Sequence, residues 1–275
     1  MSVHSVVVMR SMAVRFGREL VNAADHSARV RDVFNAVANR YDAMNDAMSF
    51  GLHRAWKRQL VNSLLPGAGQ QHLDVAGGTG DVAFEVLDRI RAAESSTCSP
   101  CRGHVSVVDT SEKMIEEGRR RAYHRAASSN FPGIATVSFD VGDAQSLWHE
   151  DNSFDSYSIA FGLRNVTDTD KALSEALRVL RPGGRVLCME FSKPQSALVS
   201  TSYTLYSEAA IPALGRVIAG DSKPYRYLVD SIQTWKNQRE LTSAFQRVGF
   251  EKVTYSNLMD GIVAIHSGFK PAEAA

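Results

Sequence analysis

The sequence predicts an α/β fold, in which a mostly parallel β-sheet is covered by helices on both faces. Short runs rich in apolar and β-branched residues alternate with stretches of helical periodicity, which is the pattern of a parallel sheet with crossover helices. Near the end of the chain, two such runs flank Met259, Asp260 and Gly261, a turn signal that predicts an antiparallel hairpin. With 275 residues, 44% of them hydrophobic, the chain can bury one large core.

Helices are expected before the sheet begins. Apolar residues recur at helical spacing from Ser27 to Val37, and Tyr41 extends the same face. A second helix is expected over residues 53–65, where a Pro-Gly pair ends it. The strands that follow are expected at 72–76, 104–109, 135–141, 154–161 and 185–191, and the helices between them at 81–93, 111–127 and 169–180.

The C-terminal third is expected to hold further helices before the terminal hairpin. Residues 196–219 are mildly apolar and contain Pro212, so they suit either core helices or a lid over a pocket. Asn237 and Glu240 have the spacing of a capping box, which predicts the start of a last helix that ends at Gly249. The expected hairpin strands are KVTYSNL and GIVAIHSGF.

Composition excludes several classes of function. The net charge is +1 with both signs interspersed, so no basic face for nucleic acid is expected. No apolar run approaches the roughly 18 residues that a membrane-spanning helix needs. The segment 92–103 is polar and small, and we expect a surface loop lengthened by insertion, away from the pocket. It contains Cys98 and Cys101, but no second ligand pair follows at suitable spacing, so a plain loop is favoured over a metal or redox site.

The first 24 residues have the composition of a mitochondrial presequence. Arg10, Arg15 and Arg18 stand against one acid, Glu19, among serines, valines and methionines. A secretory signal fits less well, because Arg10 interrupts the apolar run that precedes it. The alternative is a frayed terminus. We therefore predict a presequence over 1–24 and a single domain over 25–275.

The stretch LDVAGGTGD at 73–81 follows the first strand and crowds Gly77, Gly78 and Gly80 into four positions. Glycines there either let the backbone turn or clear space for a ligand against main-chain N–H groups at a helix N-terminus. The overlapping GTGDVA at 78–83 also satisfies G-x-G-x-x-A, which suits a dinucleotide equally well. The following Asp81 would repel a pyrophosphate, whereas the ammonium and sulfonium of S-adenosylmethionine tolerate nearby acids.

Two further strand ends favour a nucleoside. Asp109 ends the second strand, where a carboxylate can accept both ribose hydroxyls. Asp143 and Ala144 follow the third strand and suit the edge and face of an adenine. Taken singly, each has a structural alternative: Asp109 could be a helix cap and Asp143 a turn residue. Together, the turns after three successive strands predict S-adenosylmethionine.

The stretches YDAMNDAMSFGLHRAW (41–56) and RVLRPGGRVLCMEFS (178–192) resemble the two signatures of the ubiquinone and menaquinone biosynthesis C-methyltransferases. LDVAGGTGD, GDA and AFGLRNVTD lie between them in the family order, and KPYRYLVDSI and GIVAIHSGFK follow. The resemblance covers residues 27 to 270 or so. It implies a class I methyltransferase fold, which is Rossmann-like, with seven strands, one of them antiparallel near the C-terminus.

The resemblance also implies which residues form the cofactor site. Besides Gly77 and Gly78, the cofactor positions fall on Thr79, Asp109, Asp143 with Ala144, and Ala160. At Ala160 a serine is expected in bacterial relatives, so this chain would have to use a backbone group there.

The stretch FGLRN after the fourth strand makes Arg164 and Asn165 the catalytic candidates. Because a guanidinium stays protonated, Arg164 is expected to hold the phenolate rather than to act as the base. Tyr41, His53 and Tyr225 are candidates for the substrate pocket, with core packing as the alternative for the two tyrosines. Asp42 and His53 are candidate proton acceptors, although His53 could instead cap or pack its helix.

The implied substrate is a polyprenyl benzoquinol, methylated on a ring carbon during ubiquinone biosynthesis. The implied setting is a homodimer within a larger assembly of quinone-biosynthesis proteins, at the matrix face of the mitochondrial inner membrane. Residues 196–219 would then receive the polyprenyl tail. Two other functions stay open, a nicotinamide-dependent oxidoreductase and a non-catalytic scaffold of a quinone-biosynthesis complex.

Overall fold

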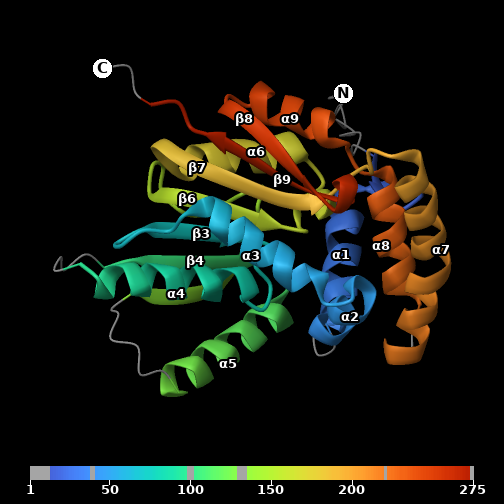
Figure 1. Ribbon diagram of the computed structural model, residues 1–275, viewed down its shortest axis with the longest axis horizontal. Helices are drawn as coiled ribbons and strands as arrows, with labels where there is room; N and C mark the ends of the chain where they lie inside the picture. Colours follow the sequence, from blue (N-terminus) through green and yellow to red (C-terminus); the bar gives the residue numbers. More distant parts are fainter. Residues whose placement is uncertain (1–12, 38–40, 98–101, 129–134, 220–221, 273–275) are drawn as a thin grey trace, which may run out of the picture.

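A seven-stranded sheet with strand order β5-β4-β3-β6-β7-β9-β8 runs through the centre of the protein (Figure 1). This computed structural model describes residues 13–37, 41–97, 102–128, 135–219 and 222–272. The strands are β3 (Gln71–Val75), β4 (His104–Asp109), β5 (Thr136–Val141), β6 (Phe154–Ala160), β7 (Leu180–Phe191), β8 (Glu251–Leu258) and β9 (Val263–Phe269). Only β9 is reversed relative to its neighbours in this sheet, which confirms the predicted mostly parallel sheet with one antiparallel strand near the C-terminus.

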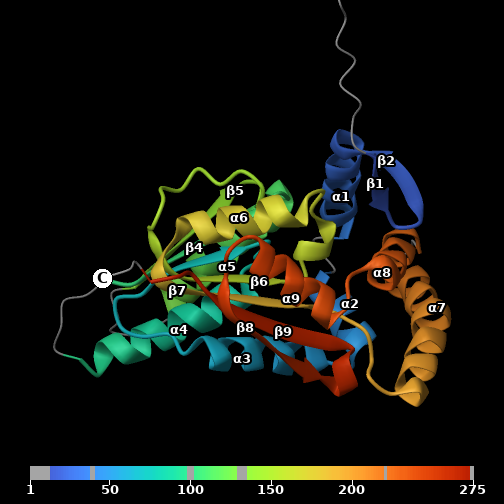
Figure 2. The same cartoon turned by 90° about the horizontal axis from the view of Figure 1, so that it is seen from above.

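Helices cover both faces of the sheet (Figure 2). One apolar cluster joins the sheet to α3 (Leu52–Leu64), α4 (Asp81–Ser95) and α5 (Glu112–Ser128). A second cluster joins the opposite face to α6 (Thr169–Val179) and α9 (Gln238–Arg247). The starts of these helices follow local sequence signals. Asp168 caps α6 by accepting from the Lys171 amide, and Asn237 and Glu240 form the predicted capping box of α9.

The remaining helices stand beyond the carboxyl ends of the parallel strands (Figure 1). They are α1 (Ala23–Val37), α2 (Tyr41–Ser49), α7 (Ala197–Ala219) and α8 (Lys223–Thr234). Helix α7 takes up the predicted segment 196–219 except Ser196, as one long helix that includes Pro212. In the described part of the chain, no helix is long and apolar enough to cross a membrane.

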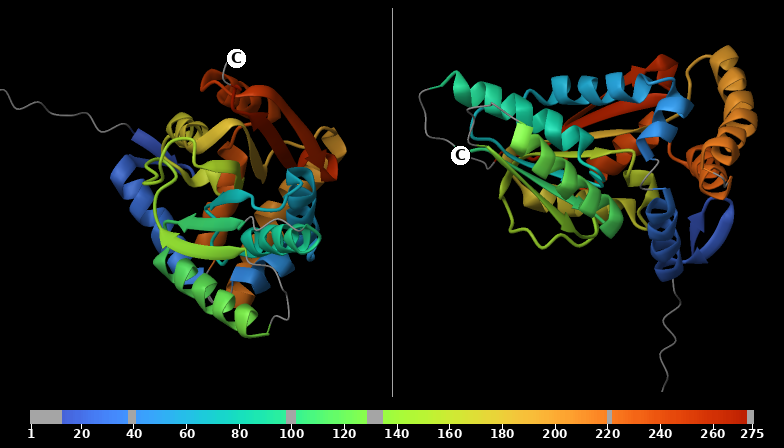
Figure 3. Two further views of the ribbon diagram at one scale, coloured as in Figure 1. Left: turned by 90° about the vertical axis from the view of Figure 1, so that its left-hand side faces the viewer. Right: turned by 90° about the horizontal axis from the view of Figure 1, so that it is seen from below.

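The segment expected to be a leader is partly folded. Residues 1–12 lie outside the described residues, but β1 (Ala13–Phe16) and β2 (Glu19–Asn22) form an antiparallel hairpin beside α8 (Figure 3). Phe16 stacks on Tyr227 with ring centroids 4.3 Å apart, and Arg18 Nε lies 2.8 Å from Asp230 Oδ1. This hairpin was not predicted, because the residues of α8 that it packs against lie some 200 positions further along the chain.

The prediction of a surface loop over 92–103 is wrong for residues 92–95, which are helical. Helix α4 continues to Ser95, and Glu94 is buried. Its carboxylate accepts hydrogen bonds from the backbone N–H groups of Gly103 and Ala135, at 2.6 and 2.9 Å, so it joins two chain segments that enter the sheet. Cys98 and Cys101 lie outside the described residues. Among the described residues, no cluster of three or more acidic, histidine or cysteine side chains could hold a metal.

Candidate active site

A cavity of about 230 Å³ lies between the carboxyl ends of the parallel strands and the helices beyond them. Its wall begins at the glycine turn after β3, continues over the ends of β4, β5 and β6, and is completed by α1, α2, α3, α7 and α8. This is the edge at which an open parallel sheet binds its ligand. All candidate site residues whose side chains are described border this cavity.

The glycine turn needs glycine for two separate reasons. A Cβ on Gly77 would lie 2.7 Å from Val107 Cγ1 and 2.8 Å from Asp74 Oδ2, so no side chain fits there. Gly78 and Gly80 have φ angles of 56° and 90°, a backbone region that other residues rarely adopt. The turn therefore presents bare backbone to the cavity immediately before α4 begins. Such a cradle suits an anionic group at a helix N-terminus.

Asp109 connects the glycine turn to the end of β4. Its Oδ2 accepts from the Gly78 amide at 3.0 Å, and its Oδ1 accepts from the Ser111 amide at 2.8 Å. Burial raises the pKa of Asp109 to about 6, although the backbone hydrogen bonds oppose this shift. The Thr110 amide also bonds to this carboxylate, which offers about four acceptor positions, so acceptor capacity stays available for a ribose hydroxyl on the cavity side.

The other predicted cofactor residues lie along the same wall. Thr79 and Ala144 are buried, and the Asp143 carboxylate accepts from the Gln145 backbone and side-chain amides at 2.9 and 3.1 Å. Ala160 ends β6 and borders the cavity without offering a hydroxyl.

Beneath the turn lies Asp74, the acid of the LDVAGGTGD stretch that precedes the glycines. It is fully buried; its Oδ1 accepts from Ser158 Oγ at 2.6 Å, while Oδ2 has no hydrogen-bond partner among the described residues. Burial raises the pKa of Asp74 to about 7. Ser158 Oγ also lies 3.0 Å from Nε2 of the buried His72, whose pKa burial lowers to about 3. An unpartnered buried carboxylate oxygen under Gly77 is suited to a positively charged ligand.

Arg164 and Asn165 lie on the 3₁₀ turn Leu163–Asn165 that follows β6. The Arg164 side chain is 4% exposed, and its Nη1 lies 3.0 Å from Oε1 of Glu190, which is 1% exposed. Its Nε donates to Ser231 Oγ at 3.3 Å, whereas Nη2 has no hydrogen-bond partner among the described residues. Glu190 was not predicted, because it lies inside an apolar strand with no local signal of its role.

Aromatic side chains line the cavity near Arg164 and Asn165. Tyr227 Oη donates to Asn165 Oδ1 at 3.0 Å and fixes the orientation of that amide. Tyr225 is buried against Met44 and Ile211 and also borders the cavity. It therefore both packs in the core and lines the cavity. The side chain of Tyr41 lies outside those described, as does that of Asp42. Tyr203 and Tyr227 join the wall without having been predicted.

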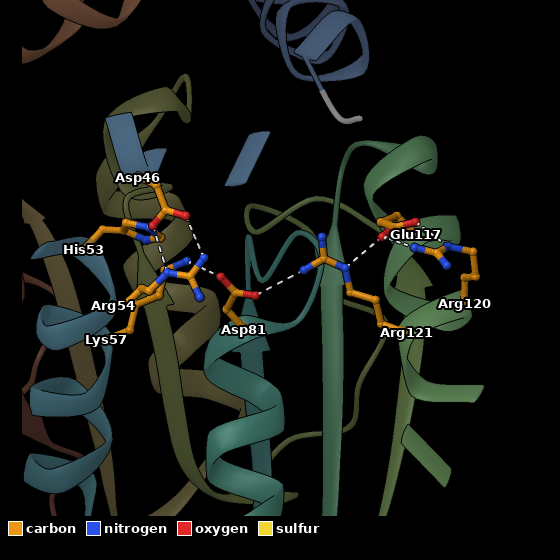
Figure 4. Close-up of polar contacts among 8 residues, drawn as sticks. All are labelled: Asp46, His53, Arg54, Lys57, Asp81, Glu117, Arg120 and Arg121. Atoms are coloured by element: carbon orange, nitrogen blue, oxygen red, sulfur yellow. Dashed lines mark hydrogen bonds and ion pairs between the residues drawn. The ribbon is translucent and has the colours of Figure 1, made fainter. Parts of the chain in front are cut away.

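A chain of charged side chains crosses the helix ends beside the cavity (Figure 4). Lys57 Nζ lies 2.7 Å from Asp81 Oδ2, and Arg121 Nη1 lies 3.3 Å from Asp81 Oδ1. Although burial opposes ionisation, these two cations hold the pKa of Asp81 below its usual value. Since Asp81 is already neutralised, it repels a pyrophosphate less than its position in the sequence implied.

Comparisons with known proteins find relatives over nearly the whole chain. A profile of the ubiE/COQ5 methyltransferase family matches residues 22–270. The chain is 46% identical over 275 residues to a mitochondrial 2-methoxy-6-polyprenyl-1,4-benzoquinol methylase of Oryza sativa subsp. japonica, covering 98% of this chain and 92% of the relative. It is 44% identical over 285 residues to the protein of that name in Rattus norvegicus, covering 95% and 85%.

Solved structures resemble the fold at low sequence identity. A SAM-dependent methyltransferase from Thermotoga maritima matches with a TM-score of 0.56 and 21% identity, covering 87% of this chain and 99% of that one. The cyclase SpnF matches with a TM-score of 0.61 and 16% identity, covering 90% and 96%. Because one neighbour is a cyclase, the fold alone does not specify the reaction.

Proposed function

The chain belongs to the ubiE/COQ5 methyltransferase family and is an S-adenosylmethionine-dependent methyltransferase of ubiquinone biosynthesis, and we propose that its methyl acceptor is a ring carbon of 2-methoxy-6-polyprenyl-1,4-benzoquinol. The name shared by the relatives, at 46% and 44% identity over nearly the whole chain, supports this acceptor. The geometric observation that carries the proposal is that one cavity joins the Gly77–Asp109 cradle to Arg164 and Asn165.

The residues present fit the cofactor. We assign the bare backbone of Gly77 and Gly78, with Thr79, to its amino-acid end, and Asp109 to its ribose. Asp143 and Ala144 would meet the adenine, and Ala160 would contribute only backbone. When bound, S-adenosylmethionine supplies a methyl group on a positively charged sulfur.

On the acceptor side, Arg164 and Asn165 are proposed to hold a ring oxygen. Nη2 of Arg164 is available for an anionic oxygen, because Glu190 and Ser231 take up other donors of the same guanidinium. A guanidinium is protonated at any physiological pH, so Arg164 binds the phenolate and does not remove its proton. Holding the reacting atoms in attack geometry can lower the activation barrier by about 7–11 kcal/mol.

A methyl-transfer assay tests the proposed function. The purified protein, S-adenosylmethionine and a short-tailed demethyl benzoquinol are incubated, and mass spectrometry locates the added carbon. Transfer to a ring carbon, abolished by Asp109→Ala, is the expected result. Calorimetry with S-adenosylhomocysteine and with NADH addresses the oxidoreductase alternative, since tight binding of NADH alone would contradict our assignment. Full ubiquinone synthesis in cells carrying Asp109→Ala would favour the scaffold.

The polyprenyl tail is proposed to enter along α7. That helix borders the cavity through Tyr203, Tyr206 and Ile211 and exposes Leu198 and Leu205 on its outside, at 79% and 71%. We propose that the outer side contacts the matrix face of the inner membrane peripherally. Flotation with liposomes should weaken when both leucines are replaced by glutamate. Unchanged flotation would argue against this placement.

The mitochondrial setting of the relatives supports import of this chain as well. We propose that the presequence ends before Ala13, because Arg15 and Arg18 belong to the β1–β2 hairpin. N-terminal sequencing of the imported protein tests this boundary. Assembly as a homodimer with other quinone-biosynthesis proteins is a further proposal, supported by family resemblance and tested by native mass spectrometry of the purified complex.

A further inference from the structure

His53 and Asp46 form a pair at the junction of α2 and α3, in which the imidazole is buried and the carboxylate side chain is 38% exposed (Figure 4). His53 is 5% exposed, and its Nε2 lies 2.8 Å from Asp46 Oδ1. Arg54 Nε and Nη2 donate to the two oxygens of the same carboxylate at 2.8 and 2.7 Å. The hydrogen bonds from Arg54 and His53 hold the pKa of Asp46 well below its usual value. Asp46 is therefore an anion, and it fixes the imidazole as the tautomer that carries its hydrogen on Nε2.

The other ring nitrogen of His53 has no assigned task in the fold. In the neutral ring Nδ1 carries a lone pair, yet it is buried and has no hydrogen-bond partner among the described residues. The residue borders the cavity. Buried acceptors are nearly always paired, so an unpaired one beside a ligand cavity points to a group that arrives with the ligand.

The charges around the ring keep it neutral. Burial lowers the pKa of His53 most strongly, and Lys57 on α3 acts in the same direction. Asp46 on α2 and Asp81 on α4 oppose them, while Arg54 offsets the charge of Asp46. The net direction is downward, so at neutral pH the ring is in the form that accepts a proton.

The carboxylates of the cavity wall are committed elsewhere. Asp81 is paired with Lys57, Asp109 is bonded to the Gly78 and Ser111 amides, and Asp143 accepts from Gln145. Asp74 lies beneath the cofactor cradle. His53 Nδ1 is thus an unpaired neutral acceptor of the described wall that lies outside the glycine cradle, unlike Asp74 Oδ2.

We propose that His53 is the general base that removes the hydroxyl proton of the benzoquinol, and that Asp46 is its positioning residue. This inference rests on the proposed function. A phenolic hydroxyl has a pKa of about 10, so a base must assist its ionisation at neutral pH. The hydroxyl proton moves to Nδ1, and the electron pair of the O–H bond moves into the ring.

Methyl transfer and loss of the ring hydrogen follow. The ring carbon forms a bond to the methyl carbon, while the C–S bond breaks and leaves its electron pair on sulfur. The methylated carbon then loses its hydrogen to water, which restores the aromatic ring and leaves an oxyanion. His53 returns its proton to that oxygen. One proton is released in all, and it balances the positive charge lost from the donor.

The test compares His53→Gln with His104→Gln, a half-buried histidine at the far end of β4, away from the cavity. We expect His53→Gln to lower kcat at pH 7 by ~10²–10⁴-fold, with little change in the Kd for S-adenosylhomocysteine measured by calorimetry. A quinol with electron-withdrawing substituents, ionised at pH 7, should recover most of the lost rate. His104→Gln should keep the wild-type kcat.

Asp46→Asn provides a readout other than activity. Nitrogen-15 NMR should show the His53 hydrogen on Nε2 in the wild type and a mixture of tautomers in the variant, with a smaller loss of kcat. An unchanged kcat and pH profile in His53→Gln would overturn the inference. A lost affinity for S-adenosylhomocysteine would also overturn it, since His53 would then be a cofactor ligand. Failure of the wild type to methylate any quinol would instead refute the proposed function.

Discussion

The buried pair of Arg164 and Glu190 allows a quantitative prediction. Glu190 accepts from the Arg164 amide at 3.2 Å, from Arg164 Nη1 at 3.0 Å and from the Phe191 amide at 2.9 Å. In Glu190→Gln one of the two oxygens becomes an NH₂ group that faces an N–H donor, and the guanidinium loses its counter-charge. Removing one partner of a buried pair costs about 3–5 kcal/mol in free energy of unfolding. At roughly 2–4 °C per kcal/mol, Tm should fall by roughly 6–20 °C.

Urea unfolding followed by circular dichroism is the assay, and the midpoint should shift without a change in m-value. The control is Asp170→Asn, which breaks the exposed ion pair with Arg247; the arginine is 55% and the aspartate 49% exposed. It should lower the free energy of unfolding by under about 1 kcal/mol. The double variant Arg164→Met with Glu190→Leu should recover most of the loss, because apolar side chains can replace a buried pair. A Glu190→Gln loss no larger than that of Asp170→Asn would refute the reasoning.

The remaining predictions concern the cradle, the hairpin and the buried acid. Gly77→Ala should weaken S-adenosylhomocysteine binding at least tenfold by calorimetry, because the added Cβ would lie 2.7 Å from Val107 Cγ1 and 2.8 Å from Asp74 Oδ2. The control Gly67→Ala should leave binding unchanged, because open space surrounds that position. Removing residues 1–12 should leave Tm unchanged and removing 1–24 should lower it, since the hairpin packs on α8; equal Tm values would show that the hairpin adds no stability. Because the folded state raises the pKa of Asp74 to about 7, it holds that proton more tightly than the unfolded chain. The stability that comes from this protonation is present below about pH 4 and is lost as pH rises through about 7. Asp74→Asn should therefore flatten the decline in Tm of the ligand-free protein between pH 5 and 8. An unchanged slope would contradict the raised pKa of Asp74.

Local sequence signals were sufficient for most of the fold. The β4 strand was predicted with its observed bounds and α9 with its capping residues, because both depend on nearest-neighbour chemistry. The β1–β2 hairpin was missed for the opposite reason. Its stability comes from Phe16 on Tyr227 and Arg18 on Asp230, contacts that local composition cannot reveal.

The residues of the site likewise divide into those that local sequence predicts and those whose role depends on distant partners. Gly77, Asp109 and Arg164 were predictable because each follows the end of a parallel strand, where ligands bind. Glu190 and Asp46 were not, since each acquires its role only through a partner brought close by the fold. The role of Asp81 changed for the same reason, as Lys57 and Arg121 neutralise it. The assignments of individual residues to cofactor and substrate stay predictions.

The distribution of charge over the cavity explains why the site is covered. The wall proposed for the cofactor carries Asp74, Asp109 and Asp143, which favour a cation, and the wall proposed for the methyl acceptor carries Arg164, which favours an anion. Transfer of a methyl group from a sulfonium to a phenolate cancels both charges. Water solvates the separated charges and so stabilises the reactants more than the transition state, whereas fixed protein groups orient them at less cost. Excluding water should therefore favour the reaction, and on this reasoning we expect α7 and α8 to contribute to catalysis beyond their packing. Variants that open this cover should lower kcat more than they weaken cofactor binding, and Tyr203→Ala with stopped-flow kinetics would test this directly; an equal effect on both would mean that the cover serves binding alone.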